Sequence, residues 1–394
     1  MNILVVGGMY PPMRTGTAFY TRNMALALKA RGHSVTVLTQ GEPDPADHND
    51  GLDVRRLPAM RLPMAGFFKH YQLCAFDPRN WLRARRIAHE VQADAILLVN
   101  HYLDIAFPAA FAAWSRAIPL VCSVGTQLQS LDPRRNRILN MLDRLVCGML
   151  VFPRCQRIVA WDTQIRQYLE DVQGPSILDK TVIVNYGVNG DSSHLLARQH
   201  DYQARHVILG VGAVSEQRSF VPLVRAFALL ASEFPQLHLR IVGHVYFDAA
   251  PRLAAELGLA GRVEFLGEQS HERVVEEMHN ADLFFSSLTG KYVGLGTAAI
   301  EAMLLSVPTV VNTPLDLLGT GMLIDGEHLI QCRQSEPEAI AANIRKLLAD
   351  AGLRQRVGLG GRAFVRQYLN WEVVARDMEQ VLLNAAVPML RQAA

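Results

Sequence analysis

The chain has 394 residues, of which 50% are hydrophobic and 19% are charged, and its formal net charge is +2. This composition excludes a disordered or fibrous chain, and the length favours two domains because single cores rarely grow beyond about 250–300 residues. No uninterrupted apolar run reaches about 18 residues, so the sequence predicts no membrane-spanning helix.

Cysteine usage and the start of the chain both favour the cytoplasm. The five cysteines are scattered and form no Cys-x-x-Cys pair, so neither a disulfide framework nor a zinc site is indicated. An apolar strand follows Met1 almost at once, without the charged segment that precedes the hydrophobic part of a secretory signal. We therefore expect a cytoplasmic protein.

The first half of the chain alternates apolar strands with helices, beginning with the apolar run at residues 2–8, which ends in glycine. A loop with Gly16 and Thr17 follows, and then a helix and a second strand up to residue 39. His101 ends a later strand, and Gly125 ends the next one. His101 is the imidazole best placed for chemistry in this half, although a lone histidine at a strand end is more often structural.

Two segments of the first half, residues 55–69 and 134–142, mix arginine or lysine with large apolar side chains. Such a mixture suits the surface of an anionic lipid leaflet, and it equally suits solvated helix faces beside a core. The second half is acidic, and it contains no nucleic-acid-binding motif. We therefore expect no nucleic-acid partner, and we retain peripheral membrane contact as an expectation.

The second half starts after a polar segment at residues 191–205, which is the natural linker. Its first strand, within residues 206–212, ends in glycine, but Ala-Val-Ser follows, so the Gly-x-Gly-x-x-Gly fingerprint of nicotinamide and flavin sites is missing. Further strands are expected within residues 262–267 and 281–287, and an amphipathic helix from residue 371 to about 390. Two doubly wound parallel sheets result.

The most informative segment spans residues 291–303, where a glycine-rich loop runs into a helix. Gly294 and Gly296 allow close approach of an anion, Thr297 adds a hydroxyl, and the first-turn amides have unpaired N–H groups. Glu301 lies about 7 Å further along the helix axis than Gly296. The segment therefore indicates a site for a diphosphate and a ribose, although it is also an ordinary good helix.

This segment resembles the signature of family 4 glycosyltransferases, retaining enzymes of the GT-B fold, and weaker matches run along nearly the whole chain. The resemblance implies two Rossmann-like domains facing across a cleft: an acceptor-binding domain at residues 1–190, the linker at 191–205, and a sugar-nucleotide-binding domain at 206–368. The helix at 369–394 is then expected to return to the first domain. The donor-binding set that the resemblance implies is Gly16, Thr17, Gly212, Arg218, Phe265, Leu266, Val293, Gly294, Leu295, Gly296, Thr297 and Glu301.

The chain departs from the family pattern at three polar positions. Val293 stands where the family has a glutamate that binds a donor-sugar hydroxyl, Ala213 replaces a diphosphate-binding arginine, and Gly125 occupies the place of an active-site histidine. Arg218 matches the remaining cationic residue. Arg218, Glu301 and His101 are therefore the candidate catalytic residues.

These features predict a retaining glycosyltransferase that moves a sugar from a nucleotide-sugar to a glycan or lipid-linked acceptor of the cell envelope. A deoxy-sugar donor would suit Val293. No Asp-x-Asp triplet is present to hold a divalent metal, so no metal or other cofactor is expected. The alternative is a catalytically silent GT-B chain that binds a partner enzyme or a glycan. A sugar-nucleotide epimerase is the weaker third interpretation, because paired acids and bases are lacking.

Overall fold

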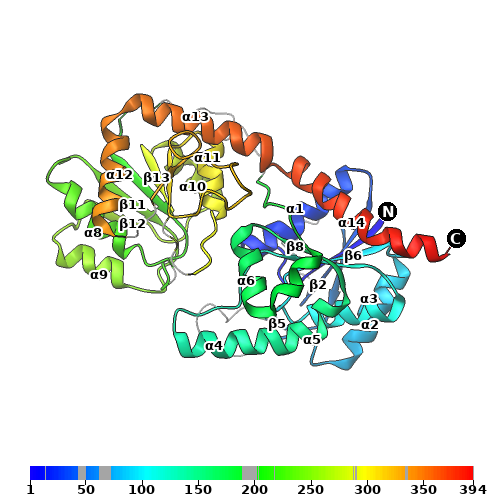
Figure 1. The fold of residues 1–394 in the computed structure, drawn as a ribbon. Coiled ribbons are helices and arrows are strands. Elements are labelled where there is room, and N and C mark those ends of the chain that lie inside the picture. The colour runs from blue at the N-terminus through cyan, green and yellow to red at the C-terminus, as the bar shows by residue number, and fades with distance from the viewer. Residues whose placement is uncertain are drawn as a thin grey trace. The chain divides into compact units, whose positions relative to one another are not determined.

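The chain forms two compact units, which are described separately (Figure 1). The computed structural model describes residues 1–13, 15–42, 50–61, 72–188, 202, 204–216, 218–286, 288, 291–332 and 336–393. Unit 1 comprises Met1–Gly187 with Trp371–Ala394, and unit 2 comprises Val188–Asn370. Most of the expected linker, residues 191–201 and 203, lies outside the described residues.

Unit 1 is built on a seven-stranded parallel sheet in the order β3-β2-β1-β6-β7-β8-β9. Its central strands are nearly continuous apolar runs because helices cover both faces of a parallel sheet. The strands are β1 (Asn2–Gly7), β2 (Ser34–Gln40), β3 (Asp53–Leu57), β6 (Ala95–Val99), β7 (Leu120–Val124), β8 (Cys155–Ala160) and β9 (Thr181–Ile183). A separate antiparallel pair joins β4 (Met60–Arg61) to β5 (Gln72–Leu73).

Side-chain caps fix where several helices of unit 1 begin. Thr15 caps α1, Asp77 caps α2 and Asp132 caps α4, each by accepting a hydrogen bond from a first-turn amide. The helical segments are α1 (Gly16–Ala30), α2 (Pro78–Glu90), α3 (Ala106–Arg116), α4 (Pro133–Leu142), the π-helical turn η2 (Asp143–Cys147), α5 (Gly148–Leu150), η3 (Phe152–Arg154), α6 (Thr163–Gln173) and η4 (Pro175–Lys180).

The last helix, α14 (Trp371–Ala393), belongs to unit 1 although unit 2 precedes it in the sequence. Its apolar residues recur every three or four positions and join the core where α14 packs against α1 and the strands β6, β7 and β8: Trp371, Val374, Ala375, Met378, Leu382 and Ala385. On the solvent side, Glu379 forms ion pairs with Arg31 and His33. The helix is therefore an integral part of the unit 1 core.

Unit 2 contains a six-stranded parallel sheet in the order β12-β11-β10-β13-β14-β15. Its strands are β10 (Val207–Val211), β11 (His238–Val242), β12 (Val263–Phe265), β13 (Leu283–Phe285), β14 (Thr309–Val311) and β15 (Ile330–Gln331). Its helices are α8 (Val221–Ala231), α9 (Ala249–Glu256), α10 (His271–His279), α11 (Thr297–Leu304), α12 (Pro337–Ala349) and α13 (Ala351–Tyr368).

The two parallel α/β sheets confirm the predicted fold class. Both sheets expose the carboxyl ends of their strands along one edge, which is where open α/β sheets bind ligands. Among the described residues, no helix combines the length and the apolar character needed to cross a bilayer.

Candidate functional site

The carboxyl ends of β10 and β11 approach each other so closely that only glycine is accommodated. Gly212 has a φ of 137°, and a Cβ on it would lie 2.1 Å from Nη1 of Arg218. Gly243 has a φ of 147°, and a Cβ there would lie 2.2 Å from the carbonyl oxygen of Gly212. The Arg218 guanidinium therefore lies directly against the end of β10.

Arg218 is held by a tight turn with Ser215, in which each backbone amide donates to the other residue's carbonyl at 3.1 Å. Burial lowers the pKa of the Arg218 guanidinium. Among the described residues, no carboxylate forms an ion pair with it. Partial burial of a cation without a counter-charge is costly, so this arrangement indicates an anion-binding position.

The glycine-rich loop follows β13, the strand next to β10, and leads into α11. Gly296, with a φ of 78°, is the N-cap residue, and no side chain caps the helix, so its first-turn amides are left for another acceptor. Two hydroxyls hold the loop in place by hydrogen bonds. Thr313 donates to the carbonyl of Gly294 at 2.9 Å, and Ser286 donates to that of Leu295 at 3.4 Å. The helix start agrees with the sequence prediction.

Glu301 lies within α11, and its carboxylate has a partner that the sequence did not reveal. The Oε1 atom is 3.4 Å from Nε2 of His271, the first residue of α10. The hydrogen bond to Glu301 raises the pKa of His271 against the lowering effect of burial. His271 is 30 positions away in sequence, so only the packing of α10 beside α11 brings the pair together.

The remaining predicted donor-binding residues of unit 2 lie at the same sheet edge. Phe265 ends β12 and is partly buried against the core, and the amide of Leu266 donates to Ile241 at 2.8 Å. Val293 and Thr297 are partly exposed, whereas Leu295 is buried. Whether each of these residues contacts a donor stays a prediction.

In unit 1, Trp161 fills the place where the family resemblance puts a histidine. A Cβ on Gly125 would lie 2.2 Å from the Trp161 ring, so any larger residue would displace the indole. Trp161 Nε1 donates to Ser123 Oγ at 2.8 Å, and its ring centroid lies 4.2 Å from that of Tyr20. The glycine and the tryptophan are thus a matched pair.

His101 is fully buried within a polar network and has no exposed surface. Its Nε2 lies 3.0 Å from Oδ2 of Asp143, which also accepts hydrogen bonds from the hydroxyl of Tyr168 and, through Oδ1, from Gln173 at 3.2 Å. Burial would raise the pKa of Asp143, but the attraction of His101 and these hydrogen bonds outweigh it and keep the pKa low.

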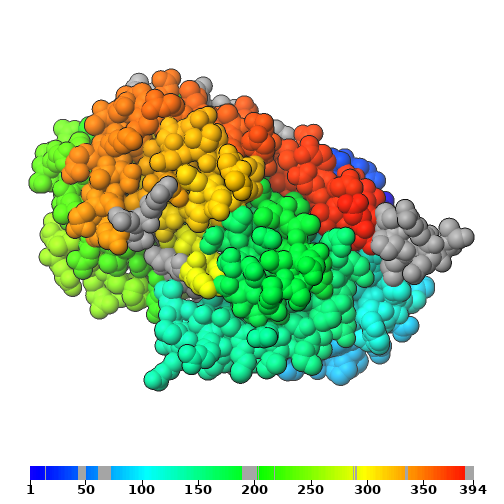
Figure 2. All heavy atoms as spheres, in the orientation of Figure 1, coloured from blue at the N-terminus to red at the C-terminus, as the bar shows by residue number. Residues whose placement is uncertain are grey.

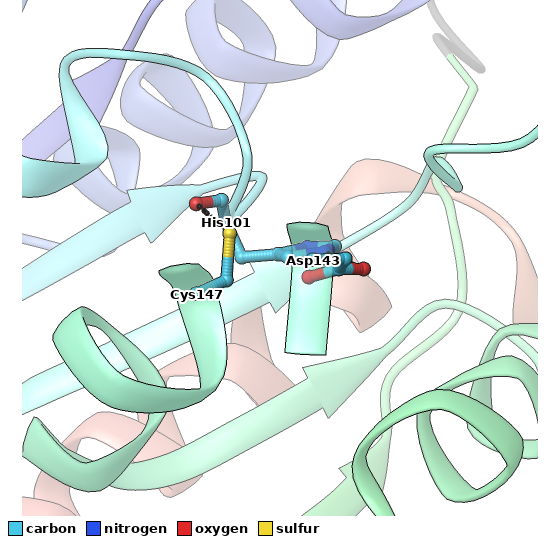
Figure 3. Close-up of side chains that lie close together, drawn as sticks. All are labelled: His101, Asp143 and Cys147. Carbon is cyan, nitrogen blue, oxygen red and sulfur yellow. Dashed lines mark hydrogen bonds and ion pairs between the residues drawn. The ribbon is translucent and has the colours of Figure 1, made fainter. Parts of the chain in front are cut away.

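Figure 3 shows the His101 ring pointing at Asp143, with the Cys147 sulfur beside the His101 main chain, to whose carbonyl it donates at 3.6 Å. Among the described residues, these three side chains form the one group of potential metal ligands with atoms within 4.8 Å of one another. Burial raises the pKa of the Cys147 thiol well above its usual range. Because protein donors already occupy the carboxylate, the group serves as a hydrogen-bond network.

Comparison with known proteins gives matches along most of the chain. The family model "Glycosyltransferase Family 4" matches residues 14–191, and "Glycosyl transferases group 1" matches residues 196–364. Glycogen synthase of Mycobacterium tuberculosis is 23% identical over 98% of this chain and 95% of its own. The phosphatidyl-myo-inositol mannosyltransferase of the same organism is 32% identical, over 51% of this chain and 53% of its own.

Solved structures share the fold at low sequence identity. Sucrose-phosphate synthase from Thermosynechococcus elongatus superposes with a TM-score of 0.73 at 20% identity, covering 100% of both chains. Anabaena HepE, solved in complex with UDP and glucose, gives a TM-score of 0.71 at 17% identity over 97% of this chain and 99% of its own.

Proposed function

The chain belongs to the family 4 glycosyltransferases, GT-B enzymes that transfer a sugar from a nucleotide-sugar, and we propose that it acts with retention on a glycan or lipid-linked acceptor of the bacterial cell envelope. One observation carries the proposal. Arg218 is a partly buried cation with no carboxylate partner among the described residues, and it lies in the turn that follows β10, the strand beside β13, which leads to the uncapped start of α11.

This arrangement would stabilise the leaving nucleoside diphosphate. As the bond between the sugar C1 and the phosphate oxygen breaks, negative charge develops on the diphosphate. Arg218 would donate two hydrogen bonds to it, and the first-turn amides of α11, which no side chain caps, would add backbone donors. The acceptor oxygen forms the new bond to C1 on the same face, and its proton leaves with the diphosphate. Glu301 would hold the ribose.

Val293 points to a donor that presents a methyl group or hydrogen where other donors present a hydroxyl. A valine offers no hydrogen bond, and an unpaired hydroxyl against it would lose its contacts with water. Val293→Glu should therefore improve turnover of a fully hydroxylated donor relative to the deoxy-sugar donor. Equal turnover of both donors by the wild type and the variant would remove the deoxy-sugar proposal.

The first test is a thermal-shift panel with UDP-, GDP-, dTDP- and ADP-sugars and the bare nucleotides, with and without Mg²⁺. A ligand at 100 times its dissociation constant stabilises by about 2.7 kcal/mol, which is readily seen as a raised melting temperature. We expect one sugar nucleotide to give a shift that does not need the metal, and Glu301→Ala to reduce it. No shift with any donor would favour the catalytically silent alternative, which a pull-down would then pursue.

A surface of unit 1 supports an acceptor held at a membrane. Residues 131–150 include eight exposed large apolar side chains, and α4 has no buried residue at all (Figure 2, teal spheres along the lower border). The apolar residues are Leu131, Ile138, Met141, Leu142, Leu145, Val146, Met149 and Leu150. We propose that this surface lies on the cytoplasmic leaflet, where a lipid-linked acceptor would be reached.

The charges on this surface favour anionic lipid. Among the described residues, the exposed Arg134, Arg135, Arg137 and Arg144 form no ion pair with a carboxylate. By contrast, Arg79 and Arg86, both on α2, pair with Asp77 and Glu90 at 2.9 and 2.7 Å. Each unpaired arginine near an anionic surface contributes on the order of 1 kcal/mol to binding.

Co-sedimentation with vesicles would test the surface. The wild type should bind vesicles that contain phosphatidylglycerol and not those of phosphatidylcholine alone. The double variant Arg134→Glu/Arg137→Glu should lose this binding, whereas the matched control Arg79→Glu/Arg86→Glu should keep it. Equal loss in both double variants would show that net charge alone is responsible and would remove the proposed surface.

A further inference from the structure

Asn100 connects three chain segments at the carboxyl edge of the unit 1 sheet. It follows β6, its side chain is fully buried, and its φ of 63° places it in the left-handed region. Its backbone N–H donates to the carbonyl of Ser123 at 2.8 Å, and this hydrogen bond joins Asn100 to β7. A non-glycine residue in this conformation costs stability, so it persists only where the surrounding contacts hold it in place.

The directions of its side-chain hydrogen bonds follow from chemistry. The backbone amide of Gly125 can only donate, and it lies 2.9 Å from Oδ1 of Asn100. The other end of the side chain is therefore Nδ2, which can only donate, and it lies 3.2 Å from Oγ1 of Thr17. Thr17 must accept this hydrogen bond, so its own hydroxyl hydrogen is directed elsewhere.

No described residue accepts that hydroxyl hydrogen from Thr17. The space beside the preceding residue is open, since a Cβ on Gly16 would meet no atom within 4 Å. Thr17 is the second residue of α1, at the helix end where the partial charge is positive. An acceptor oxygen that arrived here, on a phosphate or a sugar, would receive the hydrogen bond.

We propose that Asn100 is a positioning residue, which fixes the Thr17 hydroxyl as a hydrogen-bond donor to an oxygen of the bound sugar nucleotide. The inference rests on the proposed function. Asn100 itself is fully buried and presents no surface to a ligand, and its oxygen and its nitrogen each make one hydrogen bond, with Gly125 and with Thr17. Its role is to set the direction of the hydrogen bonds that run from the Gly125 amide to Asn100 and from Asn100 to Thr17.

Asn100→Asp is the informative change because it reverses one hydrogen bond. An aspartate still accepts from the Gly125 amide and tolerates a positive φ, but toward Thr17 it can only accept. The Thr17 hydroxyl would then donate inward and be lost to the ligand. Thr17→Val removes the hydroxyl with little change in volume. Its effect on kcat/KM is the reference against which Asn100→Asp is compared.

The experiment measures kcat and KM for the donor, with melting temperatures, in the full chain. Thr17→Val should lower kcat/KM about tenfold, the usual effect of losing one hydrogen bond to a charged group. Asn100→Asp should lower kcat/KM to within about twofold of the Thr17→Val value. The double variant Asn100→Asp/Thr17→Val should lose no more kcat/KM than either single variant. Asn80→Ala is the control, because Asn80 is equally buried and donates to Pro58 and Cys74 at 2.8 Å. It should lower the melting temperature and leave kcat/KM unchanged.

If Asn100→Asp does not fold, Asn100→Gly keeps the positive φ without the side chain. It should lower kcat/KM by about threefold to tenfold and show no further loss when combined with Thr17→Val. Wild-type kcat/KM in the Asn100 variants, or losses that multiply in the double variant, would overturn the inference alone. A wild type without transfer or binding of any donor would overturn the proposed function and this inference with it.

Discussion

Two charged groups that are shielded from water, one in each unit, differ in whether the protein supplies their partners. Asp143 in unit 1 receives hydrogen bonds from His101, Tyr168 and Gln173. Arg218 in unit 2 is partly buried and has no carboxylate partner among the described residues. A charge that the protein neutralises itself stabilises the fold, whereas a charge left without a counter-charge is available to an anionic ligand. The comparison predicts which substitutions affect stability and which affect binding.

The largest expected effect is on the stability of unit 1. Asp143→Ala leaves buried donors unsatisfied and should lower the free energy of unfolding by about 3–5 kcal/mol. Urea denaturation followed by tryptophan fluorescence measures this, because all four tryptophans, Trp81, Trp114, Trp161 and Trp371, belong to unit 1. A loss below about 1 kcal/mol would contradict a stabilising role of these hydrogen bonds to Asp143.

Arg218→Ala should lower the rate of transfer without lowering the stability of the protein. Removing one preorganised donor to the leaving group should lower kcat/KM by about 10²–10³, while the stability of unit 2 is kept or raised. Arg262 is the control, because its guanidinium donates to the carbonyls of Ala231, Phe234 and Leu237. Arg262→Ala should lower stability and leave donor affinity unchanged. Loss of stability in Arg218→Ala would break the comparison.

A smaller effect is expected where Gly125 meets Trp161. Gly125→Ala forces a Cβ against the indole and should cost about 1–3 kcal/mol of unfolding free energy. The same change in a Trp161→Ala background should cost much less. Equal costs in the two backgrounds would show that the tryptophan is not what excludes a side chain at position 125.

The smallest effect concerns His271 and Glu301. Because the pKa of His271 is raised in the folded state, the pair stabilises fully below the unfolded histidine pKa of about 6.5 and loses this contribution as pH rises through the folded pKa. The pair is exposed, so wild type should exceed His271→Gln in unfolding free energy by less than about 1 kcal/mol at pH 6. The difference should vanish at pH 8.5. A difference that grew with pH would contradict the pairing.

The sequence predicted both sheets and the start of α11, because apolar runs that end in glycine and a glycine before a helix are local signals. It predicted that His101 would end a strand, whereas β6 ends at Val99, two residues earlier, and it could not show that the side chain faces Asp143, 42 residues away. The contacts of His271 with Glu301 and of Trp161 with Gly125 are equally long-range. Such contacts depend on how elements pack, which residue spacing does not encode.

The return of α14 to unit 1 has a consequence for the order of folding on the ribosome. Unit 1 begins the chain but needs Trp371, Val374 and Met378 to complete its core. Unit 2, Val188–Asn370, is a continuous segment and leaves the ribosome entirely before α14 does. Domains generally fold as units during synthesis. Unit 2 therefore has its complete chain first. Nascent unit 1 exposes the apolar face that α14 later covers, and this surface is suited to a chaperone until α14 has left the ribosome.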